Sequence, residues 1–446
     1  MQVRTITHVH PTGEIQRYQI VEDFKLDNLR FISPGFDKKA VEEIARLYRI
    51  NIVPKQSAAF GVLVFFHVPA SIALPVVDKD DKTTYFSHNV AASVQLNSLV
   101  KQKTIRWEEN KLTSTNAFVQ TFLSTLKAQG LLTWVQGTGN GIWFIPLSAK
   151  MGFLSKQEGS LLVNSHFFLM DPTDLDSPYC ELGTPHGLAL KDSVVLNPPL
   201  NHRPCLLFDA AQKSSIQTIE LTDLTVEIDG ITYRHQDNAD FYLRPESRIT
   251  PPSKGTDIII TETQVVATKD GGETRIPMAG FVISVPNKIR IYNPKVIIHG
   301  LEAFSFGIQV GPPMMEDYQI VDTLCCPFYN AGSDAVPYPS TVYPLPFETA
   351  RAARIALGTN RDSKPVLIWA EGAGKLSYTP TQDSTGASLL ELARFCEQQG
   401  FENIINLDGG GSAQILVDHH RVLKIADRYP TNEEAERPVP YALSLA

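Results

Sequence analysis

The chain has 446 residues, 43% of them hydrophobic and 20% charged, so it can bury a sizeable core and hold more than one domain. A formal net charge of −8, with no block of Lys or Arg, argues against a nucleic-acid or anionic-membrane surface. No apolar run in the sequence reaches the roughly 18 residues that span a bilayer. The first twenty residues lack a signal-peptide pattern, so we expect a cytoplasmic protein.

The first 150 residues predict an α+β region that carries no chemical motif. Apolar residues at helical spacing predict helices over residues 37–49 and 113–129. Between them, the apolar run 60–68 predicts a buried strand, and 72–77 predicts an edge strand because Pro75 cannot donate to a ladder. We therefore treat residues 1–150 as a region of unassigned role that could pack onto the main domain.

From about residue 160 onward, the sequence predicts a mostly antiparallel sheet system. β-branched and aromatic runs alternate with turns such as Asp229-Gly230, which is typical of strands joined by tight turns. The stretch 327–346 carries five prolines and predicts a long surface loop. The predicted strands cover residues 161–168, 187–195, 218–233, 257–267, 280–285 and 295–299.

The C-terminal part predicts further strands around one helix. A strand is expected at 365–369, and a helix follows at 385–399, with Gly400 placed to end it in the left-handed conformation. A strand at 404–407 then leads into a glycine turn. After the turn we expect a hairpin that joins residues 413–417 to residues 421–425, and a last strand at 441–445.

The sharpest motif is Asn-Leu-Asp-Gly-Gly-Gly-Ser at residues 406–412, directly after a predicted strand. Three glycines remove every Cβ from one side of the turn, so backbone N–H groups can approach an anion beside the carboxylate of Asp408. A P-loop is excluded because no Lys is present and a strand follows. The structural alternative is a tight turn in which Asp408 merely caps its own backbone.

In this context the sequence resembles the phosphodiester glycosidase family over about residues 160–446. The resemblance rests on the 406–412 turn, the following hairpin, Arg437-Pro438-Val439 and a last apolar strand. Upstream matches are weaker. They comprise Asn164-Ser165-His166-Phe167-Phe168, where the family has Asn-Gly-Gly-Phe-Phe, together with the segments 277–282, 311–312, 353–358 and 386–393. The resemblance implies an α+β fold with twisted, mostly antiparallel sheets and flanking helices, in a domain over residues 151–446.

The resemblance also implies hydrolysis of a glycosyl phosphodiester, such as an N-acetylglucosamine-1-phosphodiester. The reaction passes through an oxocarbenium-like sugar, and its phosphate leaving group departs with added charge. Asp408 is the expected nucleophile or base, and Glu371 the expected second carboxylate, with Asp383 and Glu436 as alternatives. Expected contacts to sugar and phosphate come from Arg354, Arg437, Asn164, His166, Gly409, Gly410, Gly411 and Ser412.

Several alternatives stay open. Ser165 and His166 replace two glycines of the family pattern and would narrow the pocket, so a catalytically inactive carbohydrate or sugar-phosphate binding protein is the second hypothesis. His166 could be a general acid or a structural residue. Trp369 could stack on a sugar or lie in the core. No ligand spacing demands Ca²⁺, Mg²⁺ or another cofactor, and the expected partner is a small-molecule or glycan sugar-phosphate.

Overall fold

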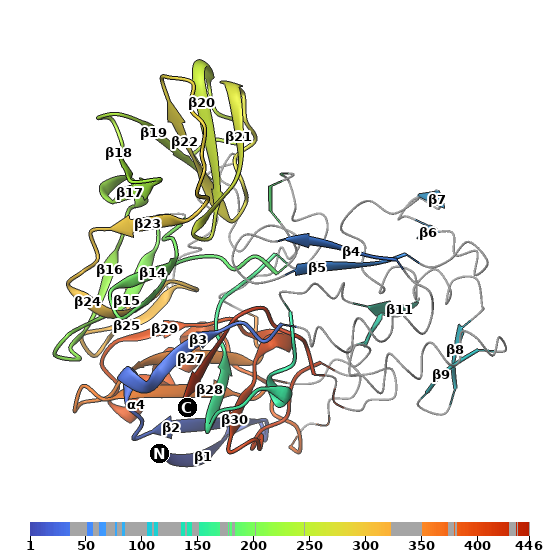
Figure 1. Ribbon diagram of the computed structural model, residues 1–446. Coiled ribbons are helices and arrows are strands. Elements are labelled where there is room, and N and C mark those ends of the chain that lie inside the picture. The colour runs from blue at the N-terminus through green and yellow to red at the C-terminus, as the bar shows by residue number, and fades with distance from the viewer. Residues whose placement is uncertain are drawn as a thin grey trace.

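The structure is a computed structural model. It describes residues 1–35, 151–169, 183–200, 202–244, 246–322, 350–372, 381–427 and 436–445, with isolated residues at 177, 179, 180, 379 and 434 and short strands between 51 and 144. Two groups of sheets stand out in Figure 1: the blue and orange-red strands lie together around both chain ends, and the green-yellow strands β17–β23 gather apart from them. The predicted site belongs to the first group.

A seven-stranded antiparallel sheet is the largest of the first group. Its central strands run through apolar sequence because they are covered on both faces. In β28, Leu367 and Trp369 point into one core, whereas Val366 and Ile368 point into the other. In spatial order the strands are β1 (Gln2–Val9), β2 (Ile15–Glu22), β28 (Pro365–Ala370), β27 (Arg354–Thr359), β29 (Ile404–Asn406), β25 (Pro313–Glu316) and β26 (Gln319–Ile320).

Two further sheets complete the core on one side of this sheet. Val163, Phe208 and Ile355 come from three different sheets and pack in one apolar cluster. The four-stranded sheet consists of β3 (Leu29–Ile32), β31 (Ala442–Leu445), β12 (Leu161–Asn164) and β30 (Ile415–Val417). The five-stranded sheet consists of β14 (Val194–Asn197), β13 (Ala189–Lys191), β24 (Phe304–Ile308), β15 (Pro204–Asp209) and β16 (Ser214–Thr218).

The second group of sheets is built on the other face of the five-stranded sheet. Side chains alternate along β15, so Leu206 and Phe208 face the first core, while Leu207 faces the second. A three-stranded sheet holds β18 (Ile231–Arg234), β17 (Thr225–Ile228) and β23 (Val296–His299). A four-stranded sheet holds β19 (Asp240–Leu243), β22 (Gly280–Val285), β20 (Pro252–Thr261) and β21 (Gln264–Gly272).

The first 32 residues supply strands to the sheets around the site. Strand β2 pairs with β28, and β3 pairs with β31. Between residues 51 and 144 the described segments are antiparallel hairpins. They are β4 (Asn51–Gln56) with β5 (Val62–His67), β6 (Val76–Val77) with β7 (Thr83–Thr84), β8 (Ile105–Glu108) with β9 (Lys111–Ser114), and β10 (Val135–Thr138) with β11 (Gly141–Phe144).

The mostly antiparallel sheets are confirmed, whereas the expected flanking helices are confirmed only in part. Among the described residues, α4 (Leu389–Gln399) is the one α-helix, and it covers one face of the seven-stranded sheet. Short 3-10 turns occur at η1 (Leu26–Asn28), η3 (Leu154–Lys156), η5 (Leu221–Asp223) and η7 (Gly410–Ser412). The predicted helix 37–49 and loop 327–346 lie outside the described residues, as does most of the predicted helix 113–129, whose first two residues belong to β9.

The C-terminal elements follow the prediction except for one strand. Strands β28, β29, β30 and β31 all form at the expected positions. The expected partner strand at 421–425 is wrong: a tight turn joins Val417 to His420, and the chain then leaves the ladder. None of the described helices is long and apolar enough to cross a membrane.

Helix α4 ends at the predicted residue but begins at Leu389, four residues later than predicted, because Ser388 caps its start. Ser388 and Glu391 form a capping box: the Glu391 amide donates to Ser388 Oγ over 3.1 Å, and the Ser388 amide donates to Glu391 Oε2 over 2.9 Å. At the other end Gly400 adopts φ 75°, which ends the helix at the predicted position. Buried Leu389, Leu392 and Cys396 then face the sheet.

We predict that Ser388→Ala lowers the free energy of unfolding by about 1 kcal/mol, because the Glu391 amide at the start of α4 loses its side-chain acceptor. Urea unfolding measures the change. Ser388→Asp is the matched control, since an aspartate can accept the same hydrogen bond, and it should retain most of the stability. Equal losses in both variants would contradict the role of the capping box.

Candidate functional site

The ends of three strands meet at the carboxamide of Asn164, the last residue of β12. Its Nδ2 donates to the carbonyl of Asp408 over 2.7 Å, and its Oδ1 accepts from the amide of Gln414 over 2.9 Å. The Asp408 amide in turn donates to the Ser165 carbonyl over 2.9 Å. These bonds fix the turn that follows β29 against β12, so Asn164 acts on the site by holding Asp408 in place.

Asp408 is a buried carboxylic acid, with 8% of its surface exposed. Burial raises the pKa of the Asp408 carboxyl to about 7, against a hydrogen bond from Ser412 and the charge of Arg437, which both lower it. A carboxyl group with this pKa exchanges a proton near neutral pH, which suits a general acid or base. Asp408 follows strand β29, as the position of the motif directly after a predicted strand implied.

The three glycines of the turn differ in what they do. The Gly410 amide donates to the Ala353 carbonyl over 2.7 Å, and the Gly409 amide bonds the Asp408 carboxylate. These two amides therefore stabilise the turn itself, and the bond from Gly409 agrees with the alternative in which Asp408 caps its own backbone. Gly410 has φ 58° and open space where a Cβ would be, so the turn is accessible there.

Gly411 makes room for an ion pair. A Cβ at this position would lie 2.2 Å from both carboxylate oxygens of Asp427 and from Nη2 of Arg437. Arg437 donates to Asp427 through Nε over 2.9 Å and through Nη2 over 3.2 Å, and its Nη1 lies 3.4 Å from Ser412 Oγ. The guanidinium is thus held against the turn by a bidentate contact with a buried carboxylate.

Arg354 begins β27 and lies against the turn from the other side. It is 3% exposed, and a Cβ at Gly409 would lie 3.6 Å from its Cα and Cδ. Its Nε donates to the Ala387 carbonyl over 3.2 Å, and its Nη2 donates to the Ala350 carbonyl over 2.7 Å. Arg354 therefore braces the start of β27 as well as bringing a positive charge to the site.

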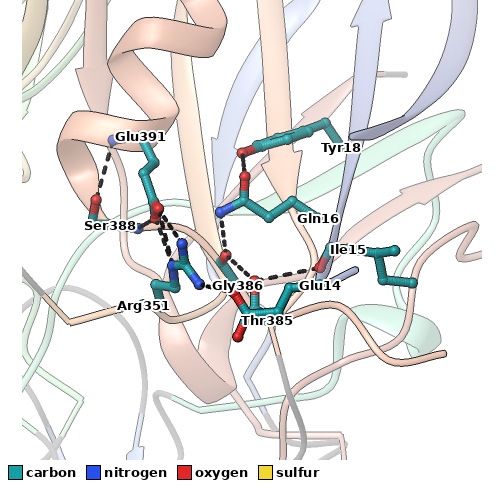
Figure 2. A network of polar contacts seen from close by, with 9 residues as sticks. All are labelled: Glu14, Ile15, Gln16, Tyr18, Arg351, Thr385, Gly386, Ser388 and Glu391. Carbon is teal, nitrogen blue, oxygen red and sulfur yellow. Dashed lines mark hydrogen bonds and ion pairs between the residues drawn. The ribbon is translucent and has the colours of Figure 1, made fainter. Parts of the chain in front are cut away.

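The network in Figure 2 supports this corner of the fold. Arg351 binds Glu391 of α4 and Glu14 of the N-terminal segment, with its Nη2 2.6 Å from Glu391 Oε1 and its Nη1 3.1 Å from Glu14 Oε2. Gln16 of β2 donates to the Gly386 carbonyl over 2.9 Å. Segments from both ends of the chain thereby hold the strand entry that carries Arg354.

Glu371, the expected second carboxylate, is buried and already bound on both oxygens. Arg17 Nη1 lies 2.9 Å from its Oε2, and the Lys424 amide donates to its Oε1 over 2.9 Å. The next residue, Gly372, packs on Ala353, whose carbonyl binds the glycine turn. Glu371 is thus close to the turn in the fold, but its carboxylate ties Arg17 to the segment that carries Asp427.

Ser165 and His166, which were expected to replace two glycines of the family pattern, are buried side chains. His166 Nε2 lies 2.9 Å from the Leu188 carbonyl, and its Nδ1 lies 3.0 Å from Ser165 Oγ, so both ring nitrogens are engaged. Burial lowers the pKa of His166 to about 4, against its hydrogen bond with Leu188. A neutral imidazole whose two nitrogens both make polar contacts favours the structural role over the general-acid role.

The other residues that the sequence singled out have contacts of their own. The Asp383 carboxylate accepts from the Thr379 amide, and Glu436 accepts from the Ser155 amide. Trp369 is fully buried in the core, which favours packing over sugar stacking. His419 and His420 are exposed at the tight turn.

Asp427 is the site residue that the sequence did not reveal. It lies after the irregular segment that was expected to be a strand, and no motif marks it. It is 6% exposed, and its charge raises the pKa of Asp408 whereas that of Arg437 lowers it. Only its place in the fold, against Gly411, shows that it belongs to the site.

Among the described residues, no candidate metal cluster occurs at this site, and the pocket described below lies elsewhere. No group of three or more His, Cys, Asp or Glu that could hold a metal occurs among the described residues. A pocket of about 620 Å³ opens instead in the second group of sheets, where Asp240, Tyr242, Pro252 and Lys254 are among its lining residues. The site is therefore defined by the side chains around Asp408.

Comparison with known proteins confirms the family resemblance over the C-terminal part of the chain. Residues 227–446 match the family model for phosphodiester glycosidase. A stretch of 72 residues is 36% identical to N-acetylglucosamine-1-phosphodiester alpha-N-acetylglucosaminidase of Mus musculus. This stretch covers 16% of this chain and only 12% of the length of that protein. The segment with Asn164 and His166 lies outside the family match.

Two solved structures show a weaker likeness. A hypothetical protein from Synechocystis has a TM-score of 0.42 and 15% identity, over 99% of this chain and 61% of that chain. The catalytic domain of zebrafish N-acetylglucosamine-1-phosphodiester alpha-N-acetylglucosaminidase, auto-inhibited by its pro-peptide, has a TM-score of 0.37 and 11% identity, over 100% of this chain and 82% of that chain.

We predict that Gly411→Ala destabilises the protein much more than Gly410→Ala. At Gly411 the new methyl group collides with the Asp427–Arg437 ion pair, whereas at Gly410 it meets nothing within 4 Å and only the positive φ costs roughly 1 kcal/mol. Thermal unfolding of the two variants measures the difference. Equal losses would show that the ion pair does not pack on the turn.

We also predict that Asp408→Asn stabilises the protein at high pH and not at low pH. Because the folded-state pKa of Asp408 is raised from 3.8 to about 7, its contribution to stability is fully present below pH 3.8 and is lost as the pH rises through 7. Asparagine carries no such penalty, so the gain should reach the order of a few kcal/mol at about pH 8. Thermal unfolding at about pH 4 and about pH 8 checks this, and a gain independent of pH would contradict it.

Proposed function

Since residues 227–446 carry a phosphodiester glycosidase domain, we propose that this protein hydrolyses the bond between a sugar's anomeric carbon and a phosphodiester. N-acetylglucosamine-1-phosphodiesters are the first substrates to examine, because the relative from Mus musculus is named for them. The observation that carries the proposal is the position of Asp408: a buried acid with a pKa of about 7, at an accessible glycine turn, beside two arginines.

The positive groups of the site suit a phosphate leaving group. As the bond to the anomeric carbon breaks, charge develops on the phosphate and on the sugar ring in opposite sense. Arg437 at the turn and Arg354 beside Gly409 supply cationic charge for the phosphate side, in a region where burial weakens screening by water. Ser412 adds a hydroxyl group next to Arg437.

Asp408 serves the sugar side of the reaction. In its ionised form it can stabilise or attack the anomeric carbon, or it can remove a proton from the attacking water. With a pKa of about 7, both protonation states of Asp408 are present near neutral pH, so one group can both accept and return the proton. Glu371 and Asp427 are both bound by arginines, and they support the site through these contacts.

The second hypothesis is a sugar-phosphate binding protein that does not catalyse. It is favoured by one observation: Ser165 and His166 fill space beside Asn164 with buried, hydrogen-bonded side chains. A narrowed pocket could hold a sugar-phosphate in a position that Asp408 cannot attack. Binding without turnover would support this hypothesis.

We predict that the wild-type protein releases free sugar from N-acetylglucosamine-1-phosphodiesters and that Asp408→Asn lowers the rate at least about 100-fold, as expected when a general acid, base or nucleophile is removed. Release of N-acetylglucosamine is measured by chromatography across several aglycones. The Asn variant keeps a similar volume, so its thermal unfolding shows whether the fold is intact.

Asp383→Asn is the matched control, because Asp383 binds the Thr379 amide and the Lys424 side chain rather than Asp408. It should hydrolyse the same substrates at nearly the wild-type rate. Binding of a sugar-1-phosphate without any turnover by the wild-type protein would reject the hydrolase in favour of the binding protein.

A further inference from the structure

A chain of polar contacts links two buried carboxylates across the glycine turn. Asp427 receives two hydrogen bonds from Arg437, at 2.9 Å and 3.2 Å. The same guanidinium reaches Ser412 Oγ with Nη1 at 3.4 Å, and Ser412 bonds the carboxylate of Asp408. The order of groups is therefore Asp427, Arg437, Ser412 and Asp408.

Within this series of contacts, Arg437 lies closer to Asp427 than to Asp408. Arg437 donates two hydrogen bonds to Asp427, through Nε and Nη2. Its contact with Asp408 runs through the Ser412 hydroxyl. Both carboxylates are more than nine-tenths buried, so water screens their charges weakly. Arg437 lowers the pKa of the Asp408 carboxyl, whereas its bound partner Asp427 raises that pKa with a smaller effect.

We propose that Asp427 is a positioning residue: it binds Arg437 through Nε and Nη2, holds the guanidinium against Gly411, and thereby limits how strongly this cation favours the ionised form of Asp408. The inference rests on the proposed function, because it assigns how that site retains an acid that can exchange a proton.

The packing of the turn makes this arrangement specific. At Gly411 a Cβ would lie 2.2 Å from the Asp427 carboxylate oxygens and from Arg437 Nη2, so the pair lies directly on the backbone of the turn. The Gln414 side chain also donates to the Arg437 carbonyl over 3.0 Å, which fixes the backbone that carries the guanidinium. Arg437 is thus held in one orientation, with Asp427 as its near partner.

Other charged groups around the turn have their own contacts. Arg354 of β27 donates to the carbonyls of Ala350 and Ala387, and Glu371 at the end of β28 binds Arg17. His166, after β12, is neutral because burial lowers its pKa to about 4. The charges of Arg437 and Asp427 shift the pKa of Asp408 in opposite directions, Arg437 downward and Asp427 upward.

The test is the titration of Asp408 in the full chain with and without the charge on Asp427. Carbon-13 NMR of protein labelled at the aspartate side-chain carboxyl carbon follows the midpoint, and Asp408→Asn assigns the signal. Asp427→Asn should lower the Asp408 midpoint by about one pH unit or more, because the repulsion disappears and Arg437 can then act on Asp408. The pH limb of sugar release should move by the same amount in the same direction.

Asp418→Asn is the matched control, since Asp418 lies exposed in the turn after β30, and it should leave the midpoint unchanged. The double variant Asp427→Asn with Arg437→Gln should reverse most of the shift. An Asp408 midpoint that stays at the wild-type value in a folded Asp427→Asn protein would overturn the inference, because a merely structural Asp427 leaves the titration unmoved.

The NMR titration can be interpreted without a substrate and with a second variant. The NMR midpoint needs no substrate, so it tests the inference even if no phosphodiester is hydrolysed and the proposed function fails. If Asp427→Asn does not fold, Arg437→Gln replaces it: removal of the cation should raise the Asp408 midpoint, and an unchanged midpoint would overturn the inference.

Discussion

The hydrogen bonds of the Asn164 carboxamide hold the site together. This one side chain binds the Asp408 carbonyl and the Gln414 amide, and it thereby joins β12 to both ends of the glycine turn. The bonds are buried, so their loss would leave polar backbone groups without partners in the core. The family resemblance suggested a contact to a sugar for Asn164, whereas in the structure its carboxamide is buried and holds the glycine turn.

The electrostatics of the site follow from the burial of the residues around the Asn164 carboxamide. Asp408 is buried, and Arg437, the cation that lowers its pKa, donates two hydrogen bonds to Asp427. Such an arrangement costs stability at high pH, because the folded protein must then hold an ionised carboxylate with incomplete compensation. The same pKa of about 7 lets Asp408 gain and lose a proton near neutral pH.

The sequence predicted features that depend on local pattern. The antiparallel strands, the end of α4 at Gly400 and the turn that places Asp408 follow from alternation and glycines. Features that depend on distant contacts were missed. Asp427 is one, because its partner Arg437 and its neighbour Gly411 come from other segments, and the use of the Gly410 amide by Ala353 is another.

The most direct test of the glycosidase assignment is the position of bond cleavage, determined by hydrolysis of an N-acetylglucosamine-1-phosphodiester in water enriched in oxygen-18. Attack at the anomeric carbon predicts that the label appears in the released sugar and that the phosphate monoester remains unlabelled, as mass spectrometry would show. Label in the phosphate would mean attack at phosphorus, and it would contradict the role given to Asp408 and to the groups that hold it.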